Sequence, residues 1–186
     1  MLRLYGKIFK TGVLTERVPA AAKPVPARAE GPVPISAEVD ETIQRAGERL
    51  KTVVDRRFRG SLAIRQVDAG SCNGCELEIH ALNNVYYGIE RFGVHFVASP
   101  RHADVLLVTG PVSRHMEAAL KRTYEAMADP KWVLAAGDCA ACGGEFGVSY
   151  ASCGAVANVI PVDGVIPGCP PPPVALIRGI LDLLAR

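Results

Sequence analysis

Four cysteines, each beside a glycine or a proline, constrain this chain more than any other feature. They lie in three short motifs: Ser71-Cys72-Asn73-Gly74-Cys75, Gly137-Asp138-Cys139 and Pro167-Gly168-Cys169-Pro170. Four cysteine thiolates, one for each iron, are the ligands of a 4Fe–4S cluster. The long gaps between the motifs are no obstacle, because folding brings distant loops together. The pattern predicts an electron-transfer subunit with one cluster held by Cys72, Cys75, Cys139 and Cys169.

A zinc site is the alternative that the spacing leaves open. Cys72 and Cys75 with Cys139 and Cys142 form a C-x2-C…C-x2-C set, a pattern that zinc sites share. The gap between its two halves is long for a compact zinc knuckle, and the set leaves Cys169 without a role. On the cluster hypothesis Cys142 and Cys153 are left over, and we expect both to be small buried packing residues.

Composition and charge limit the number of domains and the kinds of chemistry and partner that the chain can have. A chain of 186 residues suits one domain with an appendage, and six cysteines favour metal or redox chemistry over structural disulfides. No apolar run reaches the length of a membrane span, and no secretory signal is expected at the N-terminus. Residues 1–60 are basic, with 12 Lys/Arg against 7 Asp/Glu. They lack interleaved aromatic residues, so we expect no nucleic-acid partner.

Residues 1–59 are expected to form an N-terminal extension with three parts. Residues 1–14 are apolar and basic, which suits a membrane surface or a groove on a partner. A linker rich in proline and alanine follows and should stay extended. Ser36 is a suitable N-cap for an amphipathic helix, which we expect to pack on its own domain or on a neighbour rather than on lipid.

Residues 60–186 are expected to form one α/β domain. Strands are predicted over residues 62–67, 94–98, 105–108, 132–136 and 159–162, and helices over 77–87, 116–127 and 174–184. Apolar strands that alternate with helices indicate a doubly wound parallel sheet covered on both faces. Loops at the carboxyl ends of such strands meet at one edge, where ligands bind. The cysteine motifs follow three of the predicted strands.

Other polar residues near the motifs have open roles. Three of them are acidic: Glu76, Glu78 and Glu145. A carboxylate near a cluster can tune its potential or relay protons. The alternative is that these side chains are solvated or cap a helix. His80 is expected near the cluster or at an interface, and the other three histidines lack metal-ligand spacing. The sequence has no Ser–His–Asp order, GxGxxG or Walker loop. We therefore expect no catalytic residue in this chain.

Beyond the cysteine motifs, Gly143-Gly144-Glu145-Phe146 and Ile160-Pro161-Val162-Asp163 complete a recognisable pattern. Together these segments resemble the small subunit of membrane-bound, energy-converting (group 4) nickel–iron hydrogenases of the formate hydrogenlyase type. The same family includes the 20 kDa subunit of respiratory complex I. The resemblance covers about residues 60–186.

The resemblance implies a flavodoxin-like α/β domain with a single 4Fe–4S cluster. Matched motif by motif, the ligands are Cys72, Cys75, Cys139 and Cys169, while Cys142 and Cys153 match no ligand position. Complex I subunits carry adjacent cysteines at the first motif, whereas two residues separate Cys72 from Cys75 here. This difference favours the hydrogenase branch.

The resemblance also implies an assembly. The chain would be a subunit of an oxidoreductase, relaying electrons between ferredoxin-like iron–sulfur subunits and a large subunit that carries the catalytic site. It would sit peripherally on the cytoplasmic side of the membrane, with membrane subunits as further partners. One alternative is the equivalent subunit of a complex I-like oxidoreductase without nickel, which reduces quinone or another acceptor. An alternative of another class is a zinc-stabilised, non-redox assembly subunit.

Overall fold

Five parallel strands form the centre of the molecule. The computed structural model describes residues 37–185, and within them the sheet has the order β2-β1-β3-β4-β5. The strands are β1 (Leu62–Asp68), β2 (Val94–Phe96), β3 (Val105–Thr109), β4 (Trp132–Ala136) and β5 (Gly164–Ile166). This is the strand order of flavodoxin-like folds. The predicted α/β class and parallel sheet are confirmed.

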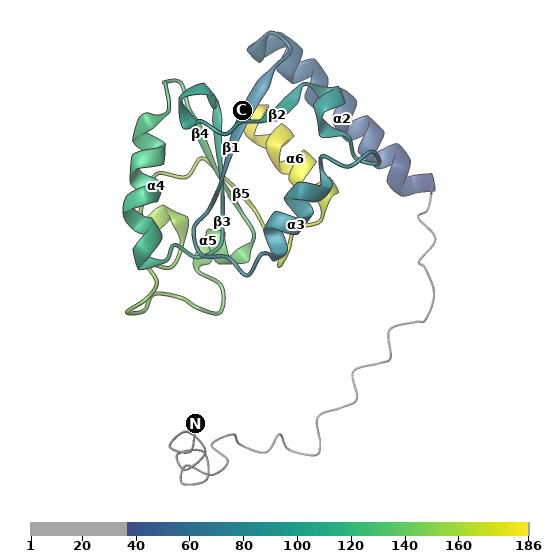
Figure 1. The fold of residues 1–186 in the computed structure, drawn as a ribbon. Coiled ribbons are helices and arrows are strands. Elements are labelled where there is room, and N and C mark those ends of the chain that lie inside the picture. The colour runs from purple at the N-terminus through teal and green to yellow at the C-terminus, as the bar shows by residue number, and fades with distance from the viewer. Residues whose placement is uncertain (1–36, 186) are drawn as a thin grey trace, which may run out of the picture. The chain divides into compact units, whose positions relative to one another are not determined.

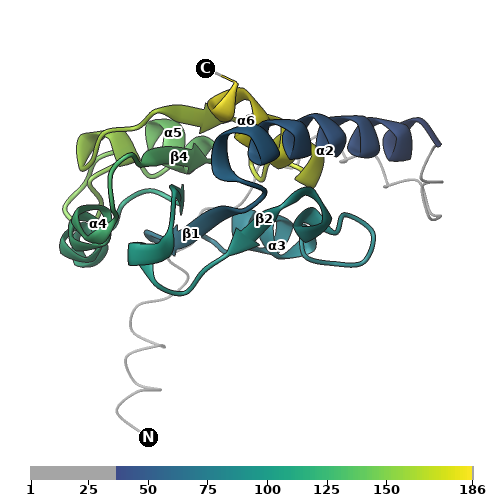
Figure 2. The ribbon, with the colours of Figure 1, turned by 90° about the horizontal axis from the view of Figure 1, so that it is seen from above.

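Helices cover both faces of the sheet (Figures 1 and 2). One face packs on α2 (Ala37–Phe58), α3 (Gly74–Ala81), α6 (Pro173–Leu184) and the short η1 (Ile89–Phe92). The other packs on α4 (Arg114–Ala126), α5 (Asp138–Cys142) and the short η3 (Val156–Asn158), while η2 (Pro100–His102) precedes β3. Because both faces are covered, every residue of β3 is buried.

The amphipathic helix α2 packs on the α/β domain. Ile43, Leu50 and Val54 are buried in the same core cluster as residues of α6. The helix therefore belongs to the same compact unit as the sheet, and the boundary expected at residue 60 does not separate them. The predicted N-cap Ser36, the apolar segment 1–14 and the proline-rich linker lie outside the described residues. No helix within residues 37–185 is long and apolar enough to cross a membrane.

The helix α3 is shorter than predicted. It ends at Ala81, whereas the apolar pattern predicted a helix as far as residue 87. The side chain of Asn84 accepts a hydrogen bond from the backbone N–H of Tyr87 at 2.9 Å. Asparagine side chains that bond to nearby backbone compete with helical hydrogen bonds, so the chain turns here and continues to η1.

The last strand lies later than predicted. The prediction of a strand over residues 159–162 is wrong, because the N–H groups of Val159 and Ile160 donate to the carbonyl of Val156 in a helical turn. Pro161 follows and has no N–H to give to a sheet. The chain joins the sheet only at Gly164, where β5 begins.

A glycine in α6 sets how closely this helix approaches β5. A Cβ atom at Gly179 would lie 2.4 Å from Cγ1 and 2.6 Å from Cδ1 of Ile166. Ile166 is buried and β-branched, so its side chain has little freedom to move away. Because Ile166 is the last residue of β5, this close packing also positions the loop that carries Cys169.

We predict that Gly179→Ala destabilises the domain. Alanine is normally favoured over glycine inside a helix by about 1 kcal/mol. Overpacking against Ile166 should cost about 1–3 kcal/mol, which leaves a net loss of stability of up to about 2 kcal/mol. Urea unfolding of the full chain measures the difference. The exposed neighbour provides a control, since Arg178→Ala should change the free energy of unfolding by about 0.5 kcal/mol or less. A more stable Gly179→Ala protein would show that the contact is not tight.

Candidate metal centre

Three loops that carry cysteines leave the carboxyl ends of strands in the parallel sheet. Cys72 and Cys75 follow β1, Cys139 follows β4, and Cys169 follows β5. The carboxyl ends of parallel strands lie at one edge of a sheet, which is where ligands bind in this class of fold. All six cysteines of the chain are free thiols, so none of these four is lost to a disulfide.

Asp138 fastens the second loop to the third. Its carboxylate oxygen Oδ1 accepts a hydrogen bond from the N–H of Gly168 at 2.8 Å. In return, the N–H of Asp138 donates to the carbonyl of Gly168 at 2.9 Å. This reciprocal pair stands directly before Cys139 and Cys169. Sequence reasoning identified Asp138 only as part of a motif, although an aspartate between a strand and a cysteine was the available signal.

Asp68 and Ser71 shape the first loop. Oδ1 of Asp68, the last residue of β1, accepts the N–H groups of Gly70 and Ser71, both at 2.8 Å. The hydroxyl of Ser71 then accepts the N–H of Asn73 at 3.1 Å, and Asn73 adopts a left-handed φ of 71° just before α3. Short polar side chains that bond to the backbone two or three residues on are typical of turns. Sequence reasoning assigned these two residues no role.

The three loops lie against one another. A Cβ atom at Gly137 would lie 2.6 Å from Sγ of Cys75 and 3.4 Å from the carbonyl oxygen of Gly168. A Cβ atom at Gly74 would lie 3.5 Å from Sγ of Cys72 and 3.8 Å from the ring of Pro170. The end of β4 therefore touches the first and third loops, and the first loop touches the third.

Glycines keep side chains away from two of the thiols. Gly137 borders Cys75, and a Cβ atom at Gly144 would lie 2.7 Å from Sγ of Cys139. Both glycines have a positive φ, of 92° and 53°, which other residues rarely adopt. The space and the bare backbone beside these sulfurs suit a bound cluster, whose sulfur atoms also accept hydrogen bonds.

The charges of neighbouring thiols act on Cys75 and Cys139. Burial raises the pKa of Cys75 to about 11, and the negative charges of Glu76, Cys139, Cys72 and Cys169 contribute to this rise. Burial likewise raises the pKa of Cys139, and the negative charges of Cys169 and Cys72 raise it further. The charges that raise these two pKa values come partly from thiols on the other cysteine loops. A cation that binds thiolates would remove the penalty on their ionisation.

The two remaining cysteines have different surroundings. Cys153 is buried, as expected, and its thiol donates to Oε2 of Glu117 at 3.4 Å. Cys142 is exposed, so the expectation of a buried residue is wrong for it. It lies at the end of α5 and its thiol donates to the carbonyl of Asp138 at 3.2 Å. The hydrogen bond occupies the thiol within its own helical turn.

The acidic residues near the motifs also differ in their surroundings. Glu76 is buried, and neither of its carboxylate oxygens has a hydrogen-bond partner among the described residues. Glu78 is half-buried, whereas Glu145 and His80 are exposed. Burying an unpaired carboxylate costs folding free energy. The stability of the fold therefore gives no reason for the buried position of Glu76.

The described residues contain no ready-made group of three or more His, Cys, Asp or Glu side chains for a metal ion. The fit to a cluster therefore rests on the loop contacts, the glycines beside the sulfurs and the donor set of four thiols. These features agree with the ligand chemistry of a 4Fe–4S cluster, which takes one thiolate for each iron.

We predict that Asp138→Ala loosens the site and Asp138→Asn largely restores it. Alanine leaves the N–H of Gly168 without its acceptor, which should cost about 1–3 kcal/mol, while the oxygen of asparagine can replace Oδ1. Metal retained per chain after gel filtration and the urea midpoint measure the effect. Equal behaviour of the two variants would mean that the hydrogen bond does not hold the loops.

Comparison with known proteins agrees with this geometry. The family profile described as "NADH ubiquinone oxidoreductase, 20 Kd subunit" matches residues 72–183, a segment that includes all four motif cysteines. Formate hydrogenlyase subunit 7 of Escherichia coli is 40% identical over 147 residues, which are 79% of this chain and 56% of that protein. The chain thus spans little more than half the length of that relative.

Two further relatives match shorter segments of the chain. A probable membrane-bound hydrogenase subunit of Pyrococcus furiosus is 48% identical over 120 residues, or 64% of this chain and 72% of that protein. An NADH-quinone oxidoreductase subunit of a Roseiflexus species is 49% identical over 110 residues, or 59% of this chain and 65% of that protein. The named relatives are subunits of oxidoreductases.

A solved structure extends the comparison to three dimensions. A chain from the membrane-bound sulfane sulfur reductase (MBS), an archaeal respiratory membrane complex, superposes with a TM-score of 0.61 and 36% sequence identity. The match covers 72% of this chain and 73% of that chain. Sequence, cysteine motifs and fold agree, and the chain belongs to the family of the 20 kDa subunit of NADH ubiquinone oxidoreductase.

Proposed function

We propose that this chain is an electron-transfer subunit with one 4Fe–4S cluster on Cys72, Cys75, Cys139 and Cys169. It relays electrons between ferredoxin-like iron–sulfur subunits and the large catalytic subunit of a membrane-associated complex of the formate hydrogenlyase type. It sits peripherally on the cytoplasmic side of the membrane and makes no bond itself. The observation that supports the proposal is that the three loops with these cysteines leave one edge of the sheet and lie against one another.

The side chains around the thiols have separate tasks in this proposal. A bound 4Fe–4S cluster supplies one-electron transfer, at a potential that its surroundings set. Asp138 holds two ligand loops together, and Gly137 and Gly144 leave the sulfurs unobstructed. Cys75 and Cys139 are half-buried, whereas Cys72 and Cys169 are exposed. The chain therefore encloses one side of the site and leaves the other open.

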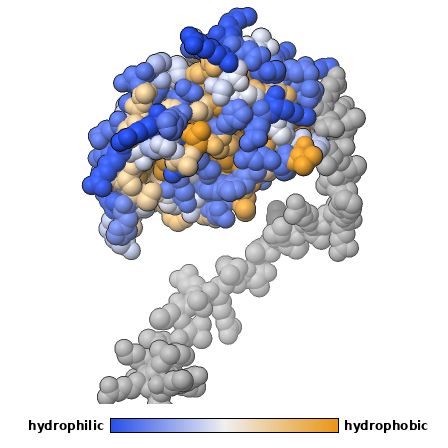
Figure 3. Space-filling model, turned by 45° about the horizontal axis from the view of Figure 1, so that its top comes forward, coloured by the Kyte–Doolittle hydropathy of each residue, from blue (hydrophilic) through white to orange (hydrophobic). Residues whose placement is uncertain are grey.

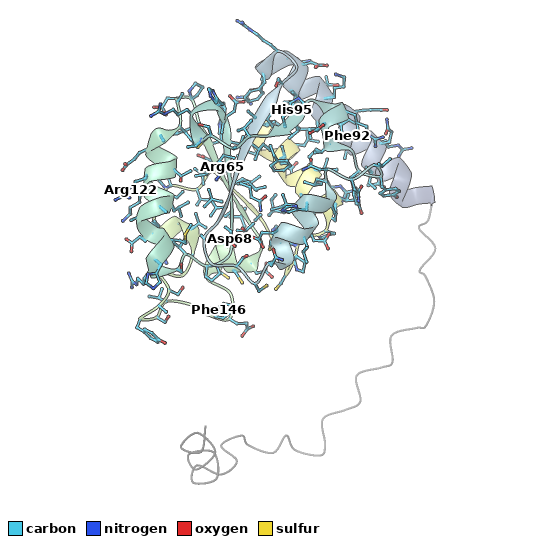
Figure 4. The ribbon with its side chains drawn as sticks, viewed as in Figure 1. Arg65, Asp68, Phe92, His95, Arg122 and Phe146 are labelled. Atoms are coloured by element: carbon cyan, nitrogen blue, oxygen red, sulfur yellow. The ribbon has the colours of Figure 1, made fainter. Side chains whose placement is uncertain are left out.

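Exposed apolar side chains near the open side favour a protein partner there. Leu77 on α3 is 64% exposed and Phe146, in the loop after α5, is 62% exposed. Figure 4 places Phe146 at the same end of the molecule as Asp68, the last residue of β1. A partner that covered these residues would also exclude water from Cys72 and Cys169. The large subunit takes this position in the proposal.

A second candidate keeps the cluster and changes the chemistry of the partner. The solved relative belongs to a complex described as a sulfane sulfur reductase rather than a hydrogenase. The equivalent subunit of a complex without nickel, which passes electrons to sulfur, quinone or another acceptor, would need the same cysteine site. The two candidates differ in the metal content of the complex and not in this chain.

Metal analysis separates all three hypotheses. In a complex purified without oxygen, we expect this chain to hold about four irons and four acid-labile sulfides. Nickel in the large subunit would favour the hydrogenase type, and its absence the second candidate. Zinc in place of iron on this chain would support the zinc-stabilised, non-redox assembly subunit and contradict the proposal, as would two clusters per chain.

The choice between Cys169 and Cys142 tests the ligand set directly. Cys169→Ala should abolish iron binding and the paramagnetic signal of the reduced cluster, and should lower stability because metal binding contributes to folding. Cys142→Ala removes an exposed thiol, so iron should stay in place and stability should change by about 0.5 kcal/mol or less. If zinc were bound by Cys72, Cys75, Cys139 and Cys142 instead, Cys142→Ala would lose the metal and Cys169→Ala would retain it. A cluster that survives Cys169→Ala and is lost in Cys142→Ala would overturn the assigned site.

A further inference from the structure

A cavity of about 730 Å³ opens at the amino edge of the sheet, opposite the cysteine loops. Its walls come from the end of α2, from η2 and from the residues that enter β1, β3 and β4. The side chains that matter for its chemistry are Arg57, Phe58, Arg59, Arg101, His102 and Trp132. The volume lies within the range of about 300–1,000 Å³ that is usual for small-molecule sites.

The cavity has an excess of positive charge. Arg59 and Arg101 are exposed, and neither forms an ion pair or hydrogen bond with another residue in the part of the chain that the structure describes. The two acidic residues of the wall are already engaged. Oδ2 of Asp104 accepts the N–H of Ala63 at 2.9 Å, and Asp129 pairs with Lys131 at 3.5 Å.

The rest of the wall is held in place by its own contacts. The guanidinium of Arg57 donates to the carbonyl of Leu184 and lies over the ring of Trp132, 5.7 Å from its centroid. The ring of Phe58 meets Trp132 edge-on, with 5.6 Å between the centroids. The lining of the cavity therefore combines fixed aromatic and cationic side chains with two exposed guanidinium groups.

We propose that this cavity binds a phosphate-bearing ligand. Guanidinium groups match phosphate oxygens with two parallel hydrogen bonds. A phosphate monoester offers three acceptor oxygens and nearly two negative charges, so one group can engage Arg59 and Arg101 together. Inorganic phosphate, a nucleotide and a phospholipid head group share this chemistry. The site lies at the opposite end of every strand from the cysteines and does not depend on the cluster.

The surface agrees with a polar ligand. Figure 3 brings the top of the Figure 1 view forward and shows hydrophilic residues over most of this face. Arg57 and Arg59 belong to the basic part of the chain, since residues 1–60 carry a charge excess of five. A phosphate group would neutralise part of that excess without disturbing the core.

The single tryptophan of the chain provides the readout. Trp132 is the only tryptophan in the sequence and its ring lines the cavity, so its fluorescence should report on occupancy. The full chain is titrated at constant ionic strength with inorganic phosphate, with ATP, and with vesicles of phosphatidylglycerol and phosphatidylcholine. We expect a saturable change with at least one of them, and the one that binds most tightly identifies the source of the phosphate.

Single substitutions then test the two guanidinium groups. Arg59→Gln and Arg101→Gln should each weaken binding by about tenfold, the loss of one charge-assisted hydrogen bond. Arg122→Gln removes an exposed guanidinium from α4 (Figure 4) that does not line the cavity, and should leave binding unchanged. Circular dichroism confirms that each variant is folded.

Three results would overturn the proposal. The first is no saturable signal with any phosphate compound, and the second is equal weakening by Arg122→Gln, which would show non-specific attraction. The third is binding of citrate or a glutamate-rich peptide where phosphate compounds have no effect. That result would assign the cavity to carboxylates, and hence to an acidic segment of a partner.

Discussion

The reciprocal hydrogen bonds between Asp138 and Gly168 hold two of the cysteine loops in one arrangement. They continue the ladder between β4 and β5, since the N–H of Gly137 still donates to the carbonyl of Ile166 at 2.8 Å. A parallel sheet brings its loops to one edge but leaves their conformations open. Hydrogen bonds between these two chain segments therefore continue beyond the ends of β4 and β5. They hold the backbone beside Cys139 and Cys169 as firmly as the sheet holds its strands.

The first loop needs a different attachment, because β3 lies between β1 and β4 in the sheet. The N–H of Ala69 donates to Thr109 at the end of β3, and the N–H of Ser113 donates back to Ala69 at 2.7 Å. Contact with the second loop is then made by packing, with Gly137 against the thiol of Cys75. A close approach of this kind tolerates no side chain at position 137, which explains why a glycine stands there.

Much of the fold could be predicted from the sequence, because apolar strands and helices leave strong periodic patterns. Cys72, Cys75 and Cys139 could be assigned to loop ends because their motifs follow such strands, whereas the strand before Cys169 was placed too early. The errors arose where local hydrogen bonding overrides the pattern, as at Asn84, where α3 had been extended too far, and at Val156, whose carbonyl closes a turn in place of a strand. The roles of Asp138 and Asp68 depend on which N–H groups lie nearby, and a single sequence does not contain that information.

The pKa shifts of two thiols bear on the role of a partner. Without metal, burial and the neighbouring charges oppose ionisation of Cys75 and Cys139, so the protein alone disfavours two of the thiolates that a cluster requires. In the proposed function, bound iron would supply the missing positive charge, since a coordinating thiol is deprotonated outright. Cys72 and Cys169 remain exposed to water, and solvent exposure is one of the factors that set a cluster's potential. In the proposed function, the potential of the site is therefore a property of the interface, because the partner that covers Leu77 and Phe146 also decides how much water reaches the sulfurs.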